Sequence, residues 1–265
     1  MKLAVTTSKK PKRNQHLRAE QVAKDLTLPL IVREQRSVEA LFNHYQIDYL
    51  FVVEKDKLLI TNRSESFFWH PGTAIKKLWE ISLGKNNSLQ IAADLKAGSS
   101  VLDCTLGFGS DAILMACIVG DKGKVVGIEA NEYIAYLTRD GLENYTQVKD
   151  YIKYHMNQIK VVHDTYQSYL SALPDNSFDV VYFDPMFRMP NKASHGINGL
   201  REFALEEPLS IKIITEALRV CKNRVVVKER IGSGVFKELG IINRIGEIKF
   251  GSVVYGYIEK LTKNT

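Results

Sequence analysis

The chain has 265 residues, of which 45% are hydrophobic and 25% are charged. This composition is ordinary for a globular protein, and it excludes the disordered, collagen-like and coiled-coil classes. Lysine and arginine outnumber aspartate and glutamate by 36 to 30, which gives a mild net charge of +6. Much of the excess precedes Glu20, where a basic stretch could attract nucleic acid or form a solvated terminus.

Membrane, disulfide and metal classes find no support in the sequence. The longest central run without charged or strongly polar residues, Ala112–Gly120, has nine residues, far short of the ~20 that cross a bilayer. The three cysteines are scattered and lack CxxC spacing, which argues against a disulfide framework and a cysteine zinc site. We therefore expect no metal, no membrane contact and a cytoplasmic location.

Residues 1–97 indicate a mixed α/β segment. Ser37 is a candidate cap for a helix, because its hydroxyl can accept a hydrogen bond from a free N–H of the first turn. We predict a small α/β domain over residues 1–70 and a helical entry to a second domain over 71–97. The predicted elements are a strand at 3–7, helices around 17–26 and 37–45, strands at 49–54, 57–61 and 65–70, and helical segments at 75–81 and 89–95.

From Gly98 onwards the pattern repeats strand, turn and helix, which is typical of a parallel sheet. The last two strands are separated only by Gly251-Ser252, so they form an antiparallel hairpin. We predict an α/β, Rossmann-like domain over residues 71–265, with a mostly parallel seven-stranded sheet ending in that hairpin. The predicted strands are 101–103, 124–129, 160–163, 178–184, 224–228, 242–250 and 253–260, and the predicted helices are 110–119, 132–142 and 208–221.

The first candidate site follows the strand that ends at Asp103. Gly107 and Gly109 let the backbone turn sharply and approach a ligand without an intervening Cβ. Glu129 ends the next strand, about 20 residues after Gly109, which is the usual offset for a carboxylate that binds ribose hydroxyls. The structural alternative is that these acids merely end their strands.

Two cofactors fit this turn, because Gly107-x-Gly109-x-x-Ala112 also matches the dinucleotide fingerprint. The acids favour S-adenosylmethionine. Asp103 precedes the glycines and Asp111 lies in the first turn of the following helix, where a carboxylate repels a pyrophosphate and attracts a cation. For Asp111 the alternative is that it only caps the helix.

Asp164 follows the third strand, at the edge of the sheet where an adenine would lie. Its carboxylate could accept a hydrogen bond from the exocyclic amine of that adenine. The alternative is that Asp164 and Thr165 only form a loop turn. We interpret His163 as a loop residue rather than a base.

The second candidate site is Asp184-Pro185-Met186-Phe187, which resembles the Asp/Asn-Pro-Pro-aromatic tetrad of methyltransferases that act on exocyclic amino groups. Such an amine is a poor nucleophile because its lone pair is delocalised into the base ring. Asp184 and a main-chain carbonyl could hold its N–H groups, Pro185 fixes the turn, and Phe187 offers a stacking face. The alternative is that Asp-Pro ends a buried strand and Phe187 fills the core.

A polar, basic loop at residues 188–201 follows the tetrad and would cover a substrate at the carboxyl edge of the sheet. Arg188, Lys192 and Arg201 could contact phosphates of that substrate. The alternative is a solvated loop. We interpret His195 as a surface residue.

Three segments, 101–112, 139–142 and 179–187, resemble the ribosomal RNA small-subunit methyltransferase J family, whose members are class I methyltransferases that modify a guanine N2. The Asp-Pro-Met-aromatic tetrad is the most specific part of a match that covers about residues 98–230. The sequence departs from the family at Ser110 and Ala130, where basic residues are usual. With the motif residues, the resemblance implies a cofactor site made of Asp103, Thr105, Gly107, Gly109, Ser110, Asp111, Glu129, Ala130, Asp164, Thr165 and Asp184.

These patterns predict an S-adenosylmethionine-dependent N-methyltransferase acting on a nucleobase amine, and the resemblance implies guanine N2 of small-subunit rRNA as the acceptor. Asp184, Pro185 and Phe187 are the predicted catalytic residues, and the basic N-terminal domain is the predicted RNA-binding part. Two alternatives stay open: an NAD(P)-dependent oxidoreductase, and a non-catalytic RNA-binding protein with a methyltransferase-like fold. A protein or small-molecule amine also fits the residues as acceptor.

Overall fold

The computed structural model describes residues 1–185, 209–232, 234–239, 245–250 and 253–260, and of residues 245–250 it describes only the backbone. Contacts divide the described chain into two units, the first made of residues 1–70 and 132–147 and the second of the remainder. Within these described ranges, no helix is long and apolar enough to cross a membrane, and no group of His, Cys, Asp and Glu could hold a metal ion.

The first unit contains a four-stranded sheet in the order β1-β2-β3-β4. β2 pairs in parallel with β1 and antiparallel with β3, and all five of its residues are buried. As predicted, Ser37 caps a helix, because its Oγ accepts a hydrogen bond from the Ala40 N–H at 3.1 Å. The elements are β1 (Leu3–Thr7), α1 (Arg13–Asp25), α2 (Val38–Tyr45), β2 (Tyr49–Val53), β3 (Leu58–Thr61) and β4 (Ser66–Phe68).

Helix α6 (Glu132–Asn144) groups with this first sheet, although it follows β6 of the second unit in the chain. The Tyr133 ring packs against Phe51 with the ring centroids 5.8 Å apart. Gly141 lies so close to Trp69 that any Cβ at position 141 would overlap the indole ring. Arg18 of α1 donates hydrogen bonds to both carboxylate oxygens of Asp140 at 2.6 Å. Aromatic packing and an ion pair from the Arg18 Nη2 therefore hold α6 in the first unit.

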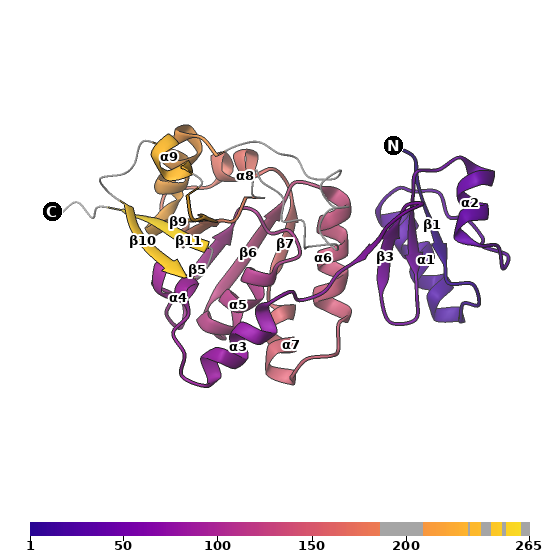
Figure 1. The fold of residues 1–265 in the computed structure, drawn as a ribbon, viewed down its shortest axis with the longest axis horizontal. Helices are drawn as coiled ribbons and strands as arrows, with labels where there is room; N and C mark the ends of the chain where they lie inside the picture. The colour runs from indigo at the N-terminus through magenta and orange to yellow at the C-terminus, as the bar shows by residue number, and fades with distance from the viewer. Residues whose placement is uncertain (186–208, 233, 240–244, 251–252, 261–265) are drawn as a thin grey trace. The chain divides into compact units, whose positions relative to one another are not determined.

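The second unit is built on a seven-stranded sheet in the order β10-β11-β9-β8-β5-β6-β7 (Figure 1). The strands from β9 to β7 in this order are parallel, whereas β11 is antiparallel to both of its neighbours. This sheet confirms the predicted α/β, Rossmann-like fold with its terminal antiparallel hairpin. The strands are β5 (Ser100–Asp103), β6 (Lys124–Glu129), β7 (Lys160–His163), β8 (Phe178–Phe183), β9 (Cys221–Arg230), β10 (Ile245–Phe250) and β11 (Val253–Glu259).

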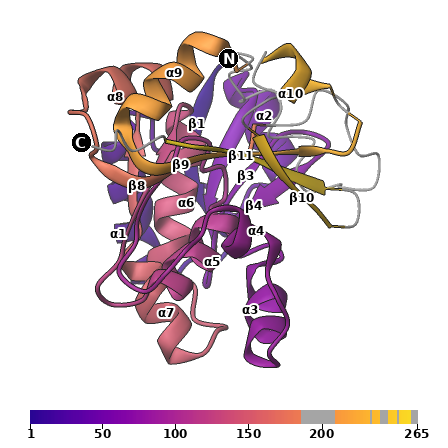
Figure 2. The same ribbon diagram turned by 90° about the vertical axis from the view of Figure 1, so that its left-hand side faces the viewer.

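Helices cover both faces of this sheet. In Figure 1, α8 and α9 lie toward the top of the second unit, and α3, α5 and α7 lie toward the bottom; Figure 2 shows the same helices from the side. The helices are α3 (Ala74–Ser82), α4 (Ser88–Ala92), α5 (Ser110–Val119), α7 (Asp150–Asn157), α8 (Tyr166–Ala172), α9 (Ile211–Val220) and α10 (Val235–Glu238).

The core of the second unit lies where neighbouring strands bring apolar side chains together beneath α9. Leu102, Val181 and Val225 come from three adjacent strands and are fully buried. Ala217 of α9 belongs to the same cluster. Burial of this kind fixes the strands against one another, and it therefore fixes the relative positions of the residues at their carboxyl ends.

Candidate active site

The predicted site residues gather at one edge of the seven-stranded sheet. Parallel strands end on the same side, so Asp103 at the end of β5 and Glu129 at the end of β6 lie on the edge that Asp184 reaches directly after β8. The chain runs from β5 to β6 on one side, whereas β8 pairs on the other side of β5. Such a reversal opens a crevice outside the strand ends, where ligands bind in α/β sheets.

The turn after β5 adopts the sharp conformation that its glycines predict. Gly107 and Gly109 have φ values of 51° and 73°, in the left-handed region that favours glycine. The Leu106 N–H donates to the Ile128 carbonyl at 2.9 Å and holds the turn against β6. Apart from its two neighbours in the chain, a Cβ built on Gly107 would meet no atom of the described residues within 4 Å.

Glu129 supports this turn from the neighbouring strand. Its Oε2 accepts from the Gly107 N–H at 3.0 Å and its Oε1 accepts from the Asn131 N–H at 2.9 Å. Burial raises the pKa of Glu129, although these backbone donors oppose the rise. Because an ionised carboxylate has about four acceptor positions, Glu129 retains capacity for a ligand after both backbone bonds.

Asp103 is almost fully buried, and its Oδ1 accepts from the Thr105 N–H at 3.0 Å. Burial raises the pKa of Asp103 from 3.8 to about 8, so its carboxyl is largely protonated at pH 7 and does not supply the negative charge that we expected to repel a pyrophosphate. The Thr105 hydroxyl accepts a hydrogen bond from the Asp184 N–H at 2.6 Å. Thr105 therefore joins the turn after β5 to the end of β8, and with it the two predicted sites.

Asp111 corrects one step of our electrostatic argument. We expected its carboxylate to help select a cationic cofactor, but Lys77 reaches its Oδ1 at 2.9 Å and Lys228 reaches its Oδ2 at 2.8 Å. The Tyr182 hydroxyl also donates to Oδ2 at 2.8 Å. Burial alone would raise the pKa of Asp111, yet the two lysines lower it below its ordinary value. Its negative charge is compensated within the protein, so this charge does not select a cationic cofactor in the way that we expected.

Lys77 and Lys228 are the site residues that our sequence analysis missed. Lys228 also donates to the Asp184 Oδ2 at 2.6 Å, so it bridges two carboxylates. A signal existed for Lys228, because this residue lies near the carboxyl end of β9, in parallel pairing with β8. Lys77 lies on α3, outside any motif, and nothing in the sequence pointed to it.

The remaining cofactor-site predictions fall on residues with differing roles. The Ser110 Oγ at the start of α5 is buried and has no hydrogen-bond partner among the described residues. The Thr165 hydroxyl caps α8 by accepting from the Ser168 N–H at 3.2 Å. The Asp164 N–H donates to the Glu129 carbonyl at 3.2 Å, which keeps Asp164 at the same sheet edge. Ala130 and Pro185 are half-buried.

Four predicted site residues, and also His195, lie outside the part of the chain that the structure describes. The four site residues are Phe187, predicted to stack on a base, and the three basic residues predicted to contact phosphates, Arg188, Lys192 and Arg201.

Comparisons with known proteins find similarity to methyltransferases. The family model described as "Putative SAM-dependent methyltransferase" matches residues 43–238. The uncharacterized protein YpiP of Bacillus subtilis is 38% identical over 236 residues, which cover 89% of this chain and 92% of that protein. The ribosomal RNA small subunit methyltransferase J of Coxiella burnetii is 33% identical over 55% of this chain and 56% of its own length. Its namesake from Desulfotalea psychrophila is 25% identical over 84% of each chain.

A solved structure shares the fold over nearly the whole chain. The SAM-dependent methyltransferase NGO1261 of Neisseria gonorrhoeae aligns over 98% of this chain and 97% of its own, with a TM-score of 0.59 and 15% sequence identity. At that identity the likeness concerns the fold alone.

Proposed function

The chain belongs to the SAM-dependent methyltransferase family, with S-adenosylmethionine as its cofactor. We propose that it methylates an exocyclic amine of a base in ribosomal RNA, and that this amine is N2 of a guanine in the small-subunit rRNA. Membership of this family decides against the nicotinamide-dependent alternative. The observation that carries the proposal is the Asp184-Pro185 pair directly after β8, tied by the Thr105 hydroxyl to the turn that holds the cofactor. The names of the relatives called ribosomal RNA small subunit methyltransferase J support the proposal that the methyl acceptor is small-subunit rRNA.

In this proposal the cofactor occupies the open edge beside β5 and β6. Glu129 accepts hydrogen bonds from the ribose hydroxyls, and Asp164 accepts one from the adenine amine. Asp103, Thr105, Gly107 and Gly109 surround the methionine part. When bound, S-adenosylmethionine supplies a methyl group whose bond to the sulfonium sulfur breaks, with the electron pair returning to sulfur, as the bond to the amine nitrogen forms. Ser110, Asp111, Ala130 and Thr165 complete the lining.

Two structural observations fit a polar ligand at this edge. The first is the buried Ser110 hydroxyl, which has no partner among the described residues and therefore has hydrogen-bonding capacity to spare. The second is the space in front of Gly107, where a Cβ would meet no described residue within 4 Å other than its chain neighbours. A side chain at position 107 would project into this space, whereas glycine leaves it to a ligand.

Asp184 binds and orients the amine that accepts the methyl group. Its carboxylate accepts one N–H of the base amine, which draws the nitrogen lone pair out of conjugation and aims it at the methyl carbon. Pro185 fixes the turn that follows, and Phe187 stacks on the base. Transfer then depends mostly on proximity and orientation, and the surplus proton of the amine leaves to water.

Residues 1–70 form the proposed RNA-binding part. Lys9, Lys10, Lys12 and Arg13 are exposed at the start of α1, where they can neutralise phosphates. Arg18 is excluded from this group because Asp140 compensates its charge. Arg188, Lys192 and Arg201 are proposed to contact phosphates near the target base.

The test is methyl transfer from tritiated S-adenosylmethionine to total RNA, ribosomal subunits and protein extract in parallel, all from cells that lack this chain. We expect label in small-subunit rRNA, and nucleoside mass spectrometry should identify N2-methylguanosine. Label confined to protein or to another nucleoside would contradict the acceptor assignment. Salt-sensitive RNA binding without any transfer would favour the non-catalytic alternative. The control is Asp184→Ala, which removes both oxygens that could accept a hydrogen bond from the amine.

A further inference from the structure

Asp184, the residue proposed to bind the methyl-accepting amine, is part of a buried cluster of charged side chains. Lys228 of β9 places its Nζ 2.6 Å from the Asp184 Oδ2 and 2.8 Å from the Asp111 Oδ2. The exposed fractions of the three side chains are 15% for Lys228, 7% for Asp111 and 28% for Asp184. Asp184 is thus the member of this bridge that is most accessible to a substrate.

The other partners of Asp111 keep Lys228 in place. Lys77 and the Tyr182 hydroxyl both bind Asp111, at 2.9 Å and 2.8 Å. Two lysines and two carboxylates give the cluster no net charge. A buried cluster of this kind needs well-made hydrogen bonds to offset the desolvation of its charges, and here Asp111 accepts three. Because its ion pair with Asp111 holds Lys228, we expect Lys228 to keep its position when Asp184 binds a ligand.

Asp184 itself is held at two points and open at a third. Thr105 binds its main-chain N–H, and Lys228 binds its Oδ2. Its Oδ1 accepts no hydrogen bond from any residue that the structure describes, and more than a quarter of the side-chain surface is exposed. One oxygen is therefore fixed and the other is available to an amine N–H.

We propose that Lys228 is a positioning residue for methyl transfer, holding the Asp184 carboxylate ionised and in one orientation so that its Oδ1 meets the acceptor amine. Asp111 and Lys77 hold Lys228 in turn. This inference rests on the proposed function, because it assigns Asp184 to the acceptor amine. Lys228 acts through Asp184 and touches neither substrate nor cofactor in this role.

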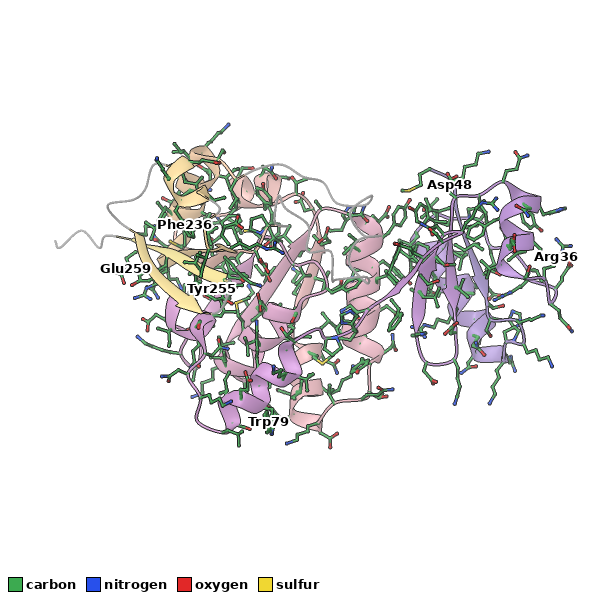
Figure 3. The ribbon with its side chains drawn as sticks, in the orientation of Figure 1. Arg36, Asp48, Trp79, Phe236, Tyr255 and Glu259 are labelled. Atoms are coloured by element: carbon green, nitrogen blue, oxygen red, sulfur yellow. The ribbon has the colours of Figure 1, made fainter. Side chains whose placement is uncertain are left out.

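Because the charges around Asp184 set its pKa, the positioning role of Lys228 should affect how the rate of methyl transfer depends on pH. Burial raises the pKa of Asp184 to about 6, Lys228 restrains this rise, and Asp111 adds to it. The other titratable groups that act on Asp184 are Lys77 from α3, Asp103 from β5, Tyr182 from β8 and Tyr255 from β11, which is labelled in Figure 3. Without Lys228 the pKa of Asp184 rises further, and the ionised form requires a higher pH.

The experiment compares Lys228→Met, Lys228→Arg and a control, Lys260→Met. Lys260 is a matched control because it follows β11 and its Nζ donates to the carbonyls of Arg219 on α9 and Cys221 at the start of β9, away from the Asp184 cluster. For each variant, kcat and KM are measured from pH 5 to 9 with total RNA from cells lacking this chain. The affinity for S-adenosylhomocysteine is measured by calorimetry, and the melting temperature reports stability.

For Lys228→Met we expect kcat to fall by at least ~10-fold at pH 7, with the acid limb of the kcat profile moved upward by about one pH unit. The affinity for S-adenosylhomocysteine should stay within about threefold of the wild type. Lys228→Arg should restore the position of the acid limb, because it keeps the charge. A Lys228→Met variant with an unmoved acid limb, or with losses no greater than those of Lys260→Met, overturns the inference.

A second measurement separates this inference from the proposed function. The pKa of Asp184 can be followed by NMR of protein labelled with carbon-13 at the aspartate carboxyl, with Asp184→Asn used to assign the signal. The inference requires a higher pKa in Lys228→Met than in the wild type, whatever the acceptor. If the wild type methylates no RNA, the proposed function fails, and this titration still decides whether Lys228 keeps Asp184 ionised.

Discussion

Replacing Asp103 with Asn removes a carboxyl that titrates inside the protein, and the effect on stability follows from its surroundings. The side chain is 2% exposed, and burial is the main cause of the rise in its pKa from 3.8 to about 8. Its hydrogen bond with the Thr105 N–H needs only an oxygen acceptor, which an Asn side chain also provides. The substitution therefore changes the titration with little change in packing.

The sign and size of the effect come from proton binding. Between pH 3.8 and about 8 the native chain holds a proton on Asp103 that the unfolded chain has released. The native state binds more protons, so wild-type stability falls as pH rises through this window, by up to about 1.4 kcal/mol per pH unit. The stabilisation is fully present below pH 3.8 and is lost as pH passes 8. From pH 5 to pH 8 the loss is therefore up to about 4 kcal/mol.

Urea unfolding at half-unit steps from pH 5 to 8.5 measures this loss. The free energy of unfolding of the wild type should fall relative to that of Asp103→Asn as pH rises, and the difference should level off above pH 8. Other titrating groups, Asp184 among them, are present in both proteins, so the difference isolates Asp103. Asp56→Asn, at an exposed turn, is the control. Parallel curves for the wild type and Asp103→Asn would refute the assignment of a buried, protonated carboxyl.

Three further substitutions test other parts of the molecule. Asp184→Ala should lower kcat by at least ~10²-fold and leave S-adenosylhomocysteine binding within about threefold, since it removes the oxygens that accept a hydrogen bond from the methyl-accepting amine; wild-type kcat should itself fall below pH 6, where Asp184 becomes protonated. Glu129→Ala should weaken S-adenosylmethionine binding by ~1–3 kcal/mol in calorimetry, the value of a charged hydrogen bond, and unchanged affinity would reject its ribose role. Gly141→Ala should destabilise the chain by ~1–3 kcal/mol in urea unfolding, because the new methyl overlaps Trp69; the stabilisation that alanine usually gives in a helix would show that the packing is looser than described.

The sequence predicted the elements best where buried apolar runs are bounded by turns. The strands Leu3–Thr7, Lys124–Glu129 and Lys160–His163 match their predicted limits. β9 is longer than predicted, because β8 and β11 pair along it from both sides and carry its polar ends into the sheet. Pairing of this kind depends on distant segments and leaves no local signal.

The missed helices have weak local patterns. In α7 only Ile152 and Met156 are buried, which is a single apolar pair at helical spacing. α8 has one buried residue, Leu170, and its cap is Thr165, which we had assigned to the cofactor site. α10 has four residues, too few for any periodicity.

The site was predictable where chemistry coincides with the end of a strand. Asp103, Glu129 and Asp184 each follow an apolar run, and parallel strands bring such positions together. The ion pairs were not predictable, because Lys228 and Lys77 are separated from Asp111 by 117 and 34 residues in the chain. Without these partners, Asp111 reads as a free charge, which was the error in our argument for the cofactor.

The position of α6 limits how this molecule can be dissected. A fragment that ends at residue 70 would lose Gly141 and Tyr133, and would leave the rings of Trp69 and Phe51 bare to water. It would also strip Arg18 of its counter-ion, Asp140. RNA recognition by the first unit is therefore better studied with point substitutions in the intact polypeptide than with a shortened one. Weak RNA binding by a shortened chain could result from unfolding or aggregation as well as from lost contacts with RNA.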